Sequence, residues 1–273
     1  MKRTPAVVAV NAILLFAAVV TVFPLFWMLS VSFMPSGAAS TYPPPLLPDA
    51  PTLENYRELF AGQAAGRYLF NSAVVATLAT IISLTFNTMA GYAFAKLRFR
   101  GRDRIFQALL GALVIPAQVT LIPLFALVKE LGLVSTYAGV LVPSLATVFG
   151  IFLIRQYALS LPDELLEAAR IDGASERRIF WWLVIPLLRP ILVTLAILTF
   201  LATWNDFMWP LIVLTSQEMY TLPVALAGLS REHVQENEMM MAGAVITVAP
   251  VLILFLGLQR YYIAGILAGG VKG

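Results

Sequence analysis

Residues 161–175 read Leu-Pro-Asp-Glu-Leu-Leu-Glu-Ala-Ala-Arg-Ile-Asp-Gly-Ala-Ser and separate two long apolar runs. The segment predicts a short helix. Pro162 suits the first helical position, where its missing N–H costs nothing, and Asp163 with Glu164 complements the positive end of the helix dipole. Gly173 is expected to end the helix, because glycine readily adopts the left-handed backbone found at many helix C-termini. We therefore expect a charged helix between two apolar segments.

A second helix is expected to begin at Ser175, a residue type that favours the N-cap position. Its Trp181-Trp182 pair fits the aromatic belt at a membrane interface. Pro186 and Pro190 follow, and each removes a backbone donor from a helix. We expect them to kink the chain before the next apolar run.

The apolar runs are long enough to cross a membrane, which takes about 20 mostly apolar residues. The chain has 273 residues, of which 60% are hydrophobic and 12% are charged, whereas about 25% are charged in soluble domains. We therefore predict one all-α membrane domain over residues 1–273 with six transmembrane helices. The expected spans are about 6–29, 69–95, 105–128, 132–154, 191–214 and 239–258, with a cytoplasmic loop at about 160–190.

The distribution of basic residues sets the expected orientation, because Lys and Arg gather in cytoplasmic loops. If the N-terminus is cytoplasmic, the outer side holds only Arg57, Arg67, Lys129 and Arg231 of the 18 Lys and Arg residues. We therefore predict that both termini are cytoplasmic. The net charge of +3 then reflects topology, and no nucleic-acid partner is expected.

The residue inventory excludes several kinds of chemistry. There is no Cys, and the only His is His233, so a His/Cys metal site or a His-based triad cannot be built from this chain alone. No Gly-Lys pair occurs, so a Walker A phosphate loop is absent. We expect no catalytic residue, cofactor or metal in this chain, and any ATP that drives it must bind another chain.

The two largest outer loops differ in composition. Residues 34–67 are rich in Pro, although residues 53–60 are compatible with a short helix. Residues 216–238 are acidic. A solvated loop and a docking face for an outside partner both explain that charge.

The spacing within the cytoplasmic loop is specific to one family. Glu167-Ala168-Ala169, Gly173 and Leu183-Val184-Ile185-Pro186 resemble the EAA loop of ABC-importer permeases, and the loop precedes the next-to-last span, as in that family. Further stretches resemble the carbohydrate-type subfamily: Pro24-Leu25-Phe26-Trp27, Asn71-Ser72, Gly91-Tyr92-Ala93-Phe94-Ala95, Phe99-Arg100-Gly101, Ile115-Pro116-Ala117-Gln118 with Pro123, Trp204-Asn205-Asp206, Trp209-Pro210, and the tail from Gln259 to Gly273. The chain looks similar to the smaller permease subunits of maltose-type and glycerol-3-phosphate-type importers.

The resemblance implies a type I ABC importer permease fold and a subunit that moves a sugar or related small solute into the cell. It also implies a second permease subunit forming a heterodimer, a cytosolic ABC ATPase dimer, an extracytoplasmic solute-binding protein and a multi-pass location in a bacterial or archaeal plasma membrane, in contact with lipid. The EAA loop would form the coupling helix against the ATPase. Its implied coupling residues are Glu167, Ala168, Ala169, Asp172, Gly173 and Pro186.

Residues of the translocation pathway are harder to assign. Asp206 is the only ionisable residue within the spans apart from their ends, and an acid at such depth is a functional candidate. We take Trp204, Asn205 and Asp206 as candidates, although an acid hydrogen-bonded to a neighbouring helix, beside packed or interfacial rings, explains them equally.

Three alternatives to a sugar permease of the ABC type stay open, of which a membrane-anchored receptor or scaffold without transport explains the topology only. A secondary transporter with Asp206 as an ion relay explains the intramembrane acid but not the EAA loop. Glycerol-3-phosphate is the main alternative substrate. The spans carry no buried Lys or Arg, which favours a neutral sugar over an anion.

Overall fold

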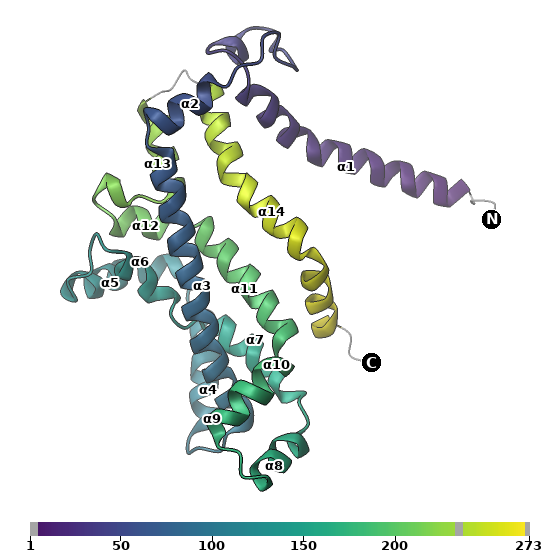
Figure 1. The fold of residues 1–273 in the computed structure, drawn as a ribbon, viewed down its shortest axis with the longest axis vertical. Coiled ribbons are helices and arrows are strands. Elements are labelled where there is room, and N and C mark those ends of the chain that lie inside the picture. The colour runs from purple at the N-terminus through teal and green to yellow at the C-terminus, as the bar shows by residue number, and fades with distance from the viewer. Residues whose placement is uncertain (1–4, 233–236, 271–273) are drawn as a thin grey trace. The chain divides into compact units, whose positions relative to one another are not determined.

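The computed structural model describes residues 5–232 and 237–270, and within these residues the chain forms helices joined by loops, without strands (Figure 1). The prediction of an all-α protein is confirmed. Lys2, Arg3, His233 and the last three residues of the tail, 271–273, lie outside the described residues.

Three of the predicted spans are each a single long helix. These are α1 (Pro5–Ser32), α3 (Ala65–Lys96) and α14 (Asn237–Gly270). Among the described residues, these are the helices long and apolar enough to cross a membrane alone, and six crossings result if each of three bent helix pairs counts as one span. The side chains of residues 7–26 in α1 are all exposed, which suits a helix that contacts lipid or another subunit.

The third predicted span, 105–128, is broken near its middle. It consists of α4 (Arg102–Ala112) and α5 (Ala117–Glu130), which are bent by 106° relative to each other. Pro116 lies at the break with an extended ψ of 133°. Proline lacks an N–H and disfavours a helical conformation in the residue before it, which explains the break.

The fourth predicted span, 132–154, is also interrupted. The short helix α6 (Tyr137–Leu141) continues as η2 (Val142–Ser144), and after a bend of 43° the chain resumes as α7 (Val148–Leu159). The side chain of Asn87 on α3 satisfies this break, because its Oδ1 accepts a hydrogen bond from Thr147 N at 2.9 Å. Irregular backbone within a membrane needs such a partner inside the protein.

The fifth predicted span, 191–214, contains α11 (Arg189–Trp204) and the short α12 (Met208–Val213). The loop before it forms α8 (Asp163–Ile171), α9 (Glu176–Ile179), the π-helical turn η3 (Phe180–Val184) and α10 (Ile185–Leu187). Pro186 has no N–H to donate, and Ile185 N bonds Phe180 O five residues back. The segments 176–187 and 189–204 meet at 78°, so the predicted kink is confirmed.

The chain divides into two compact units. The first comprises Met1–Arg67 and Ala225–Pro250. It contains α1, η1 (Ala38–Ser40) and α2 (Glu54–Ala61), which confirms the short helix expected in the Pro-rich loop. Its core is formed by Leu59, Ala65, Leu229, Met239 and Ala242.

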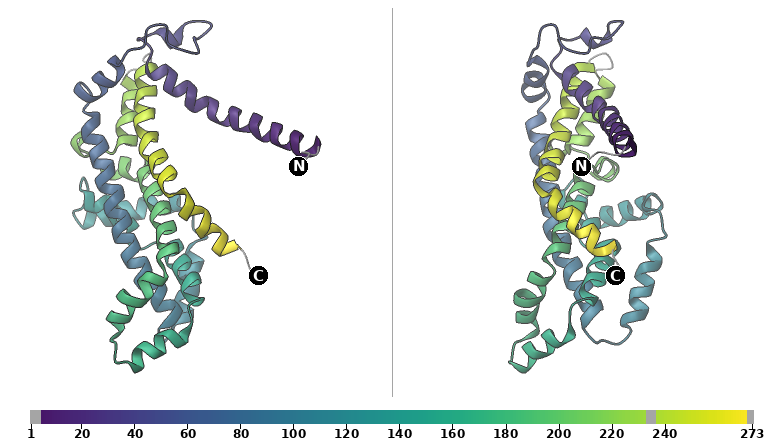
Figure 2. Two further views of the ribbon diagram at one scale, coloured as in Figure 1. Left: turned by 45° about the vertical axis from the view of Figure 1, so that its right-hand side comes forward. Right: turned by 90° about the vertical axis from the view of Figure 1, so that its right-hand side faces the viewer.

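The second unit comprises Tyr68–Val224 and Val251–Gly273 and holds the coupling loop. It includes η4 (Gln217–Met219), and α13 (Leu222–Glu232) begins in it. One of its apolar clusters joins α3, α7, α8 and α11 around Ile154, Leu166 and Leu188. A second joins α3, α5, α6 and α12 around Val75, Val128 and Trp209. In all three ribbon views α8 lies at one extreme of this unit (Figures 1 and 2).

Candidate functional site

The coupling segment folds as the helix–turn–helix that its residues predict. Helix α8 runs from Asp163 to Ile171, one residue later than expected, because Pro162 takes the N-cap position with an extended ψ of 130°. Gly173 follows the helix with a φ of +80°, a left-handed conformation that costs other residues energy. Ser175 caps α9, since its Oγ accepts a hydrogen bond from Arg178 N.

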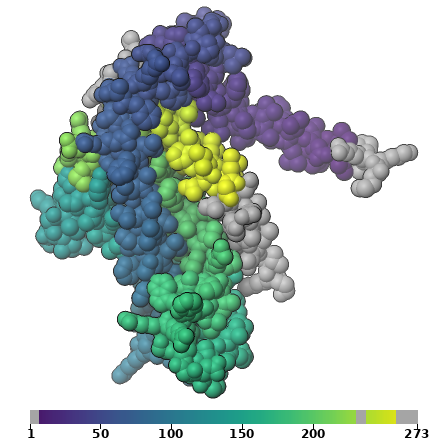
Figure 3. Space-filling model, viewed as in Figure 1, coloured from purple at the N-terminus to yellow at the C-terminus, as the bar shows by residue number. Residues whose placement is uncertain are grey.

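Helix α8 has one anchored face and one exposed face. Leu166 is 2% exposed and lies in the cluster with Ile154 and Leu188, and Ala169 packs half-buried against it. On the other side Glu167 and Ala168 are exposed, as are the apolar side chains of Leu165 and Ile171, at 45% and 86%. Figure 3 shows the segment that contains α8 and α9 forming the tip of the second unit. A firmly seated helix thus presents apolar and acidic side chains outward.

Lys96, the last residue of α3, fastens the start of α8. Its Nζ donates to Leu161 O at 2.6 Å and to Asp163 Oδ1 at 2.7 Å, and its side chain is only 5% exposed. Burying an ammonium group is costly unless its donors are satisfied. Lys96 holds the pKa of the Asp163 carboxyl below its usual value through this hydrogen bond and its charge. No pattern in the sequence signals this contact, because the partners lie 67 positions apart.

The end of α8 is fastened to α9 by a second ion pair. Arg170 Nε donates to Glu176 Oε1 at 2.7 Å across the glycine turn. This hydrogen bond raises the pKa of Arg170, so the guanidinium stays charged. Of the other predicted coupling residues, Asp172 and Pro186 are exposed. The structure therefore brings Glu167, Ala168, Asp172 and Gly173 to one exposed tip, with Ala169 turned toward the core.

Helix α3 meets α7 at a close crossing beside this tip. A Cβ on Gly91 would lie 2.7 Å from both Cβ and Cγ2 of Ile154 and 3.0 Å from Arg155 N. Only glycine permits this approach, which explains why the Gly-Tyr-Ala-Phe-Ala stretch begins with glycine at position 91. Arg155 donates through Nε to Phe94 O and lies with its Cζ 4.0 Å from the centre of the Phe106 ring. The crossing thus ties α7, which leads into α8, to α3.

The other end of α3 holds a second polar cluster. Asn71 Nδ2 donates to Glu218 O and Tyr220 O, both at 2.9 Å, and its Oδ1 accepts from Tyr137 OH at 2.8 Å. Ser72 Oγ accepts from Leu222 N at 2.8 Å. The Asn71-Ser72 pair therefore fixes the loop between α12 and α13.

The predicted pathway residues do not share one environment. Trp204 is buried, and its ring stacks on Phe200 with centroids 5.7 Å apart. Asn205 is exposed and donates to Leu201 O. Asp206 is half-buried, and its Oδ1 accepts from Trp209 N at 3.4 Å. The acid thus lies against the first turn of α12, in the manner of a helix cap.

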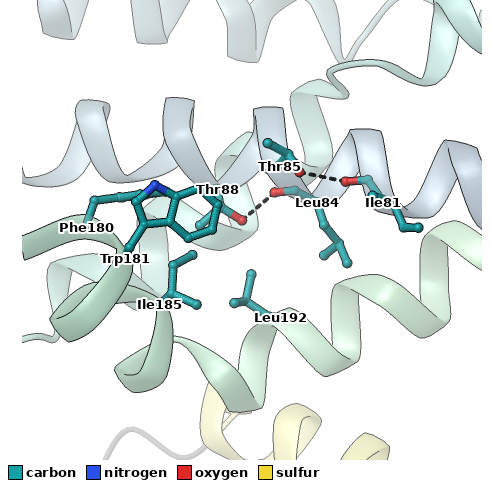
Figure 4. A pocket seen from close by; sticks show the side chains of 8 residues that line it. All are labelled: Ile81, Leu84, Thr85, Thr88, Phe180, Trp181, Ile185 and Leu192. Atoms are coloured by element: carbon teal, nitrogen blue, oxygen red, sulfur yellow. Dashed lines mark hydrogen bonds between the residues drawn. The ribbon is translucent and has the colours of Figure 1, made fainter. Parts of the chain in front are cut away.

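A separate cavity of about 240 Å³ lies between α3 and the segment from η3 to α11 (Figure 4). Its lining is Ile81, Leu84, Thr85, Thr88, Phe180, Trp181, Ile185 and Leu192. The two threonine hydroxyls donate to carbonyls of their own helix, Leu84 O and Ile81 O, so the walls are largely apolar. None of the predicted pathway residues lines this cavity.

Comparison with known proteins decides the family. Residues 87–267 match the family described as "Binding-protein-dependent transport system inner membrane component". The chain belongs to this family. Membership in this transport-permease family confirms the resemblance on which the sequence prediction rests and supports an ATP-driven importer over an ion-driven one. It also implies an ATPase and a solute-binding protein as partners, and a location in the inner membrane.

Individual relatives cover nearly the whole permease. It is 42% identical over 267 residues to the arabinooligosaccharides transport system permease protein AraQ of Halalkalibacterium halodurans, covering 94% of each chain. It is 30% identical to the lactose transport system permease protein LacG of Rhizobium radiobacter, over 99% of this chain and 98% of that one. A crystal structure of a bacterial ABC transporter involved in the import of the acidic polysaccharide alginate matches with a TM-score of 0.84 at 26% identity, over 96% of this chain and 99% of that chain. The type I importer permease fold is therefore confirmed.

Proposed function

We propose that this permease subunit carries an oligosaccharide into the cell as one half of a heterodimer, with ATP hydrolysis by a cytosolic ABC dimer acting on α8. The observation that carries the proposal is the exposed face of α8 on a helix anchored from behind by Leu166 and Lys96. A helix fixed in this way can transmit a displacement by the ATPase to the transmembrane helices, because a packed core moves as a unit and deforms little.

Within this proposal the exposed residues of the tip contact the ATPase. Glu167 would pair with a basic residue, Ala168 would allow close approach, and Leu165 and Ile171 would fill an apolar groove. Gly173 and Asp172 would shape the turn that follows, while Ala169 and Pro186 would hold the segment in position. We propose that α8 and both chain termini lie on the cytoplasmic side of a bacterial or archaeal plasma membrane.

The proposed substrate is a neutral oligosaccharide. AraQ and LacG are named for the transport of arabinooligosaccharides and of lactose. Lys96, at the end of α3, and Arg155, within α7, both donate hydrogen bonds to backbone carbonyls of the protein and so are not free to hold an anion. Near α12 the ionisable group is an acid, Asp206. We propose that Trp204, Asn205 and Asp206 border the pathway, with Asn205 the most accessible of the three.

Cross-linking from a single thiol tests the coupling role. The chain contains no Cys, so Ala168→Cys introduces one exposed thiol on the outer face of α8. We expect it to cross-link to an ATPase subunit that carries a phosphate loop, identified by mass spectrometry in membranes of the host. Ala169→Cys is the matched control, because that side chain faces the core and should cross-link far less. Equal cross-linking from both positions, or none from Ala168→Cys in an inserted protein, would argue against the proposal.

A further inference from the structure

Helix α3 is fastened at both ends to segments that are remote in sequence. At one end Lys96 holds the start of α8 through Leu161 O and Asp163. At the other end Asn71 and Ser72 hold the loop at residues 218–222. About 25 helical residues separate the two fastenings, which corresponds to roughly 37 Å at 1.5 Å per residue. That length exceeds the hydrocarbon thickness of a bilayer, about 30 Å.

The side chains that make these contacts are buried and well satisfied. Asn71 is 2% exposed, and both its amide nitrogen and its carbonyl oxygen are bonded. The Lys96 ammonium makes two hydrogen bonds with a nearly fully buried side chain. Hydrogen bonds from charged groups are about twice as strong as neutral ones. Both fastenings therefore resist being pulled apart.

The covalent route from α8 to α11 is far less regular. It passes through Gly173 with φ +80°, the four residues of α9, the π-helical turn 180–184 and a bend of 78°. The glycine turn, the π-helical turn and the bend each interrupt the regular i to i−4 hydrogen bonding that stiffens a helix. Helix α3, by contrast, is one unbroken helix of 32 residues without proline.

From these contacts we infer that α3 is a strut that couples the α8 tip to the 218–222 loop on the opposite membrane face, with Lys96, Asn71 and Ser72 as positioning residues. The inference rests on the proposed coupling role of α8. Displacement of α8 by the ATPase would move α3 along with it, and α3 would move the loop. In the reverse direction, a partner that docks on this loop would influence α8.

A reporter at the loop tests the strut without knowledge of the solute. Gln217→Cys places the chain's only thiol on an exposed residue beside Glu218, whose carbonyl Asn71 holds. The complete transporter is reconstituted in liposomes, and the rate of maleimide labelling of this chain is compared with and without vanadate-trapped ATP. With Lys96 and Asn71 intact we expect trapping to change the rate by about 5-fold or more, the range of ordinary allosteric coupling.

Three single variants, one double variant and one control probe the fastenings in the reporter background. Lys96→Met should abolish the nucleotide-dependent change, and Asn71→Ala should remove most of it, because only the bond of Leu222 N to Ser72 Oγ then holds the loop. The double variant should lose no more of the response than Lys96→Met alone, because both changes interrupt one path. Asp163→Asn removes an exposed carboxylate but leaves the bond of Lys96 to Leu161 O, so its response should be intermediate. Arg100→Met is the charge-matched control on an exposed residue and should respond like the reporter alone.

The outcomes separate this inference from the proposed function. The Ala168→Cys cross-link, repeated in each variant background, shows whether the ATPase still binds. Without that cross-link in the otherwise unaltered chain, the proposed function fails. If the ATPase binds but trapping leaves the reporter unchanged, or if folded Lys96→Met responds fully, the strut is wrong and the proposed function stands. Should Lys96→Met fail to insert, a full response in Asp163→Asn together with one in Asn71→Ala would overturn the strut.

Discussion

Replacing Gly91 by alanine tests the crossing of α3 and α7 directly. The new Cβ would lie 2.7 Å from two atoms of Ile154 and 3.0 Å from a backbone nitrogen, closer than carbon atoms approach without displacement. Ile154 is fully buried, so its side chain cannot turn aside into solvent. Overpacking of this kind costs about 1–3 kcal/mol. Alanine also stabilises a helix interior by about 0.8–1 kcal/mol relative to glycine, which offsets part of that cost.

Gly111 supplies a control that removes the helix-propensity term. It lies inside α4, and a Cβ there would have no atom within 4 Å. Gly111→Ala should therefore be neutral or slightly stabilising. The difference between the two variants isolates the overpacking, so Gly91→Ala should be less stable than Gly111→Ala by about 1–3 kcal/mol.

The comparison is made by reversible unfolding of the purified protein in mixed detergent micelles, with the free energy of unfolding measured for both variants and the unaltered chain. Uptake in cells that carry the complete transporter gives a second readout, since the crossing ties α7 and α8 to α3. If Gly91→Ala were as stable as Gly111→Ala, α3 and α7 would not approach each other as the structure has them, and the packing argument would fail.

Three further outcomes follow from the same geometry. At position 173, whose backbone is left-handed, stability should fall in the order Gly, Asn, Ala, with alanine lower than glycine by about 1–2 kcal/mol; equal stability of all variants would contradict the assigned turn. Gly173→Asp should insert normally yet lose uptake. Asp206→Asn should keep uptake within about 3-fold, since the amide oxygen can still accept from Trp209 N; abolished uptake would instead favour the ion-relay alternative. Lys96 lowers the pKa of Asp163 from its usual 3.8, so the ion pair stabilises the fold above pH 3.8, and this stabilisation is lost as the pH falls through the lowered pKa. Acidification below about pH 4 should therefore lower the melting temperature of the unaltered protein more than that of Asp163→Asn. If both melting temperatures fell in parallel, the pair would contribute nothing.

Local chemistry was readable from the sequence wherever one residue decides the backbone. Gly173 ends the coupling helix and Ser175 caps the next one, as their residue types predict. The chain bends between Pro186 and Pro190, at the start of α11, as expected. Helix α8 begins one residue later than predicted, because Pro162 serves as the N-cap.

Breaks within the apolar runs were harder to predict, because hydropathy averages over a window and is blind to geometry. Pro116 is visible in the sequence, yet a single proline in a membrane span can kink a helix or end it. The interruption before α7 leaves still less trace, because it depends on Asn87 of another helix. Partners so far apart along the chain cannot be paired by pattern alone.

The candidate site divides in the same way. The exposed tip with Glu167, Ala168 and Gly173 follows from a motif and a helix end, and both are local. Ala169 faces the core because Leu166, three residues earlier, is the residue of α8 that packs into the buried cluster. The sequence does not show which of the several apolar residues of α8 takes that place. The sequence does not predict the burial of Lys96, since a basic residue at the end of a span usually marks a membrane boundary.

The polar residues of α3 suggest why this helix stays regular while its neighbours break. Asn71, Asn87 and Lys96 each bond backbone groups of an irregular segment: the loop 218–222, the break at Thr147 and the start of α8. A buried backbone group without a hydrogen-bond partner costs free energy, so these interruptions depend on side chains of another helix. A helix that supplies such partners at fixed heights must keep its own 1.5 Å rise, since a break in α3 would shift all three at once. The regularity of α3 and the irregularity of the segments before α7, before α8 and after α12 are therefore two aspects of one arrangement.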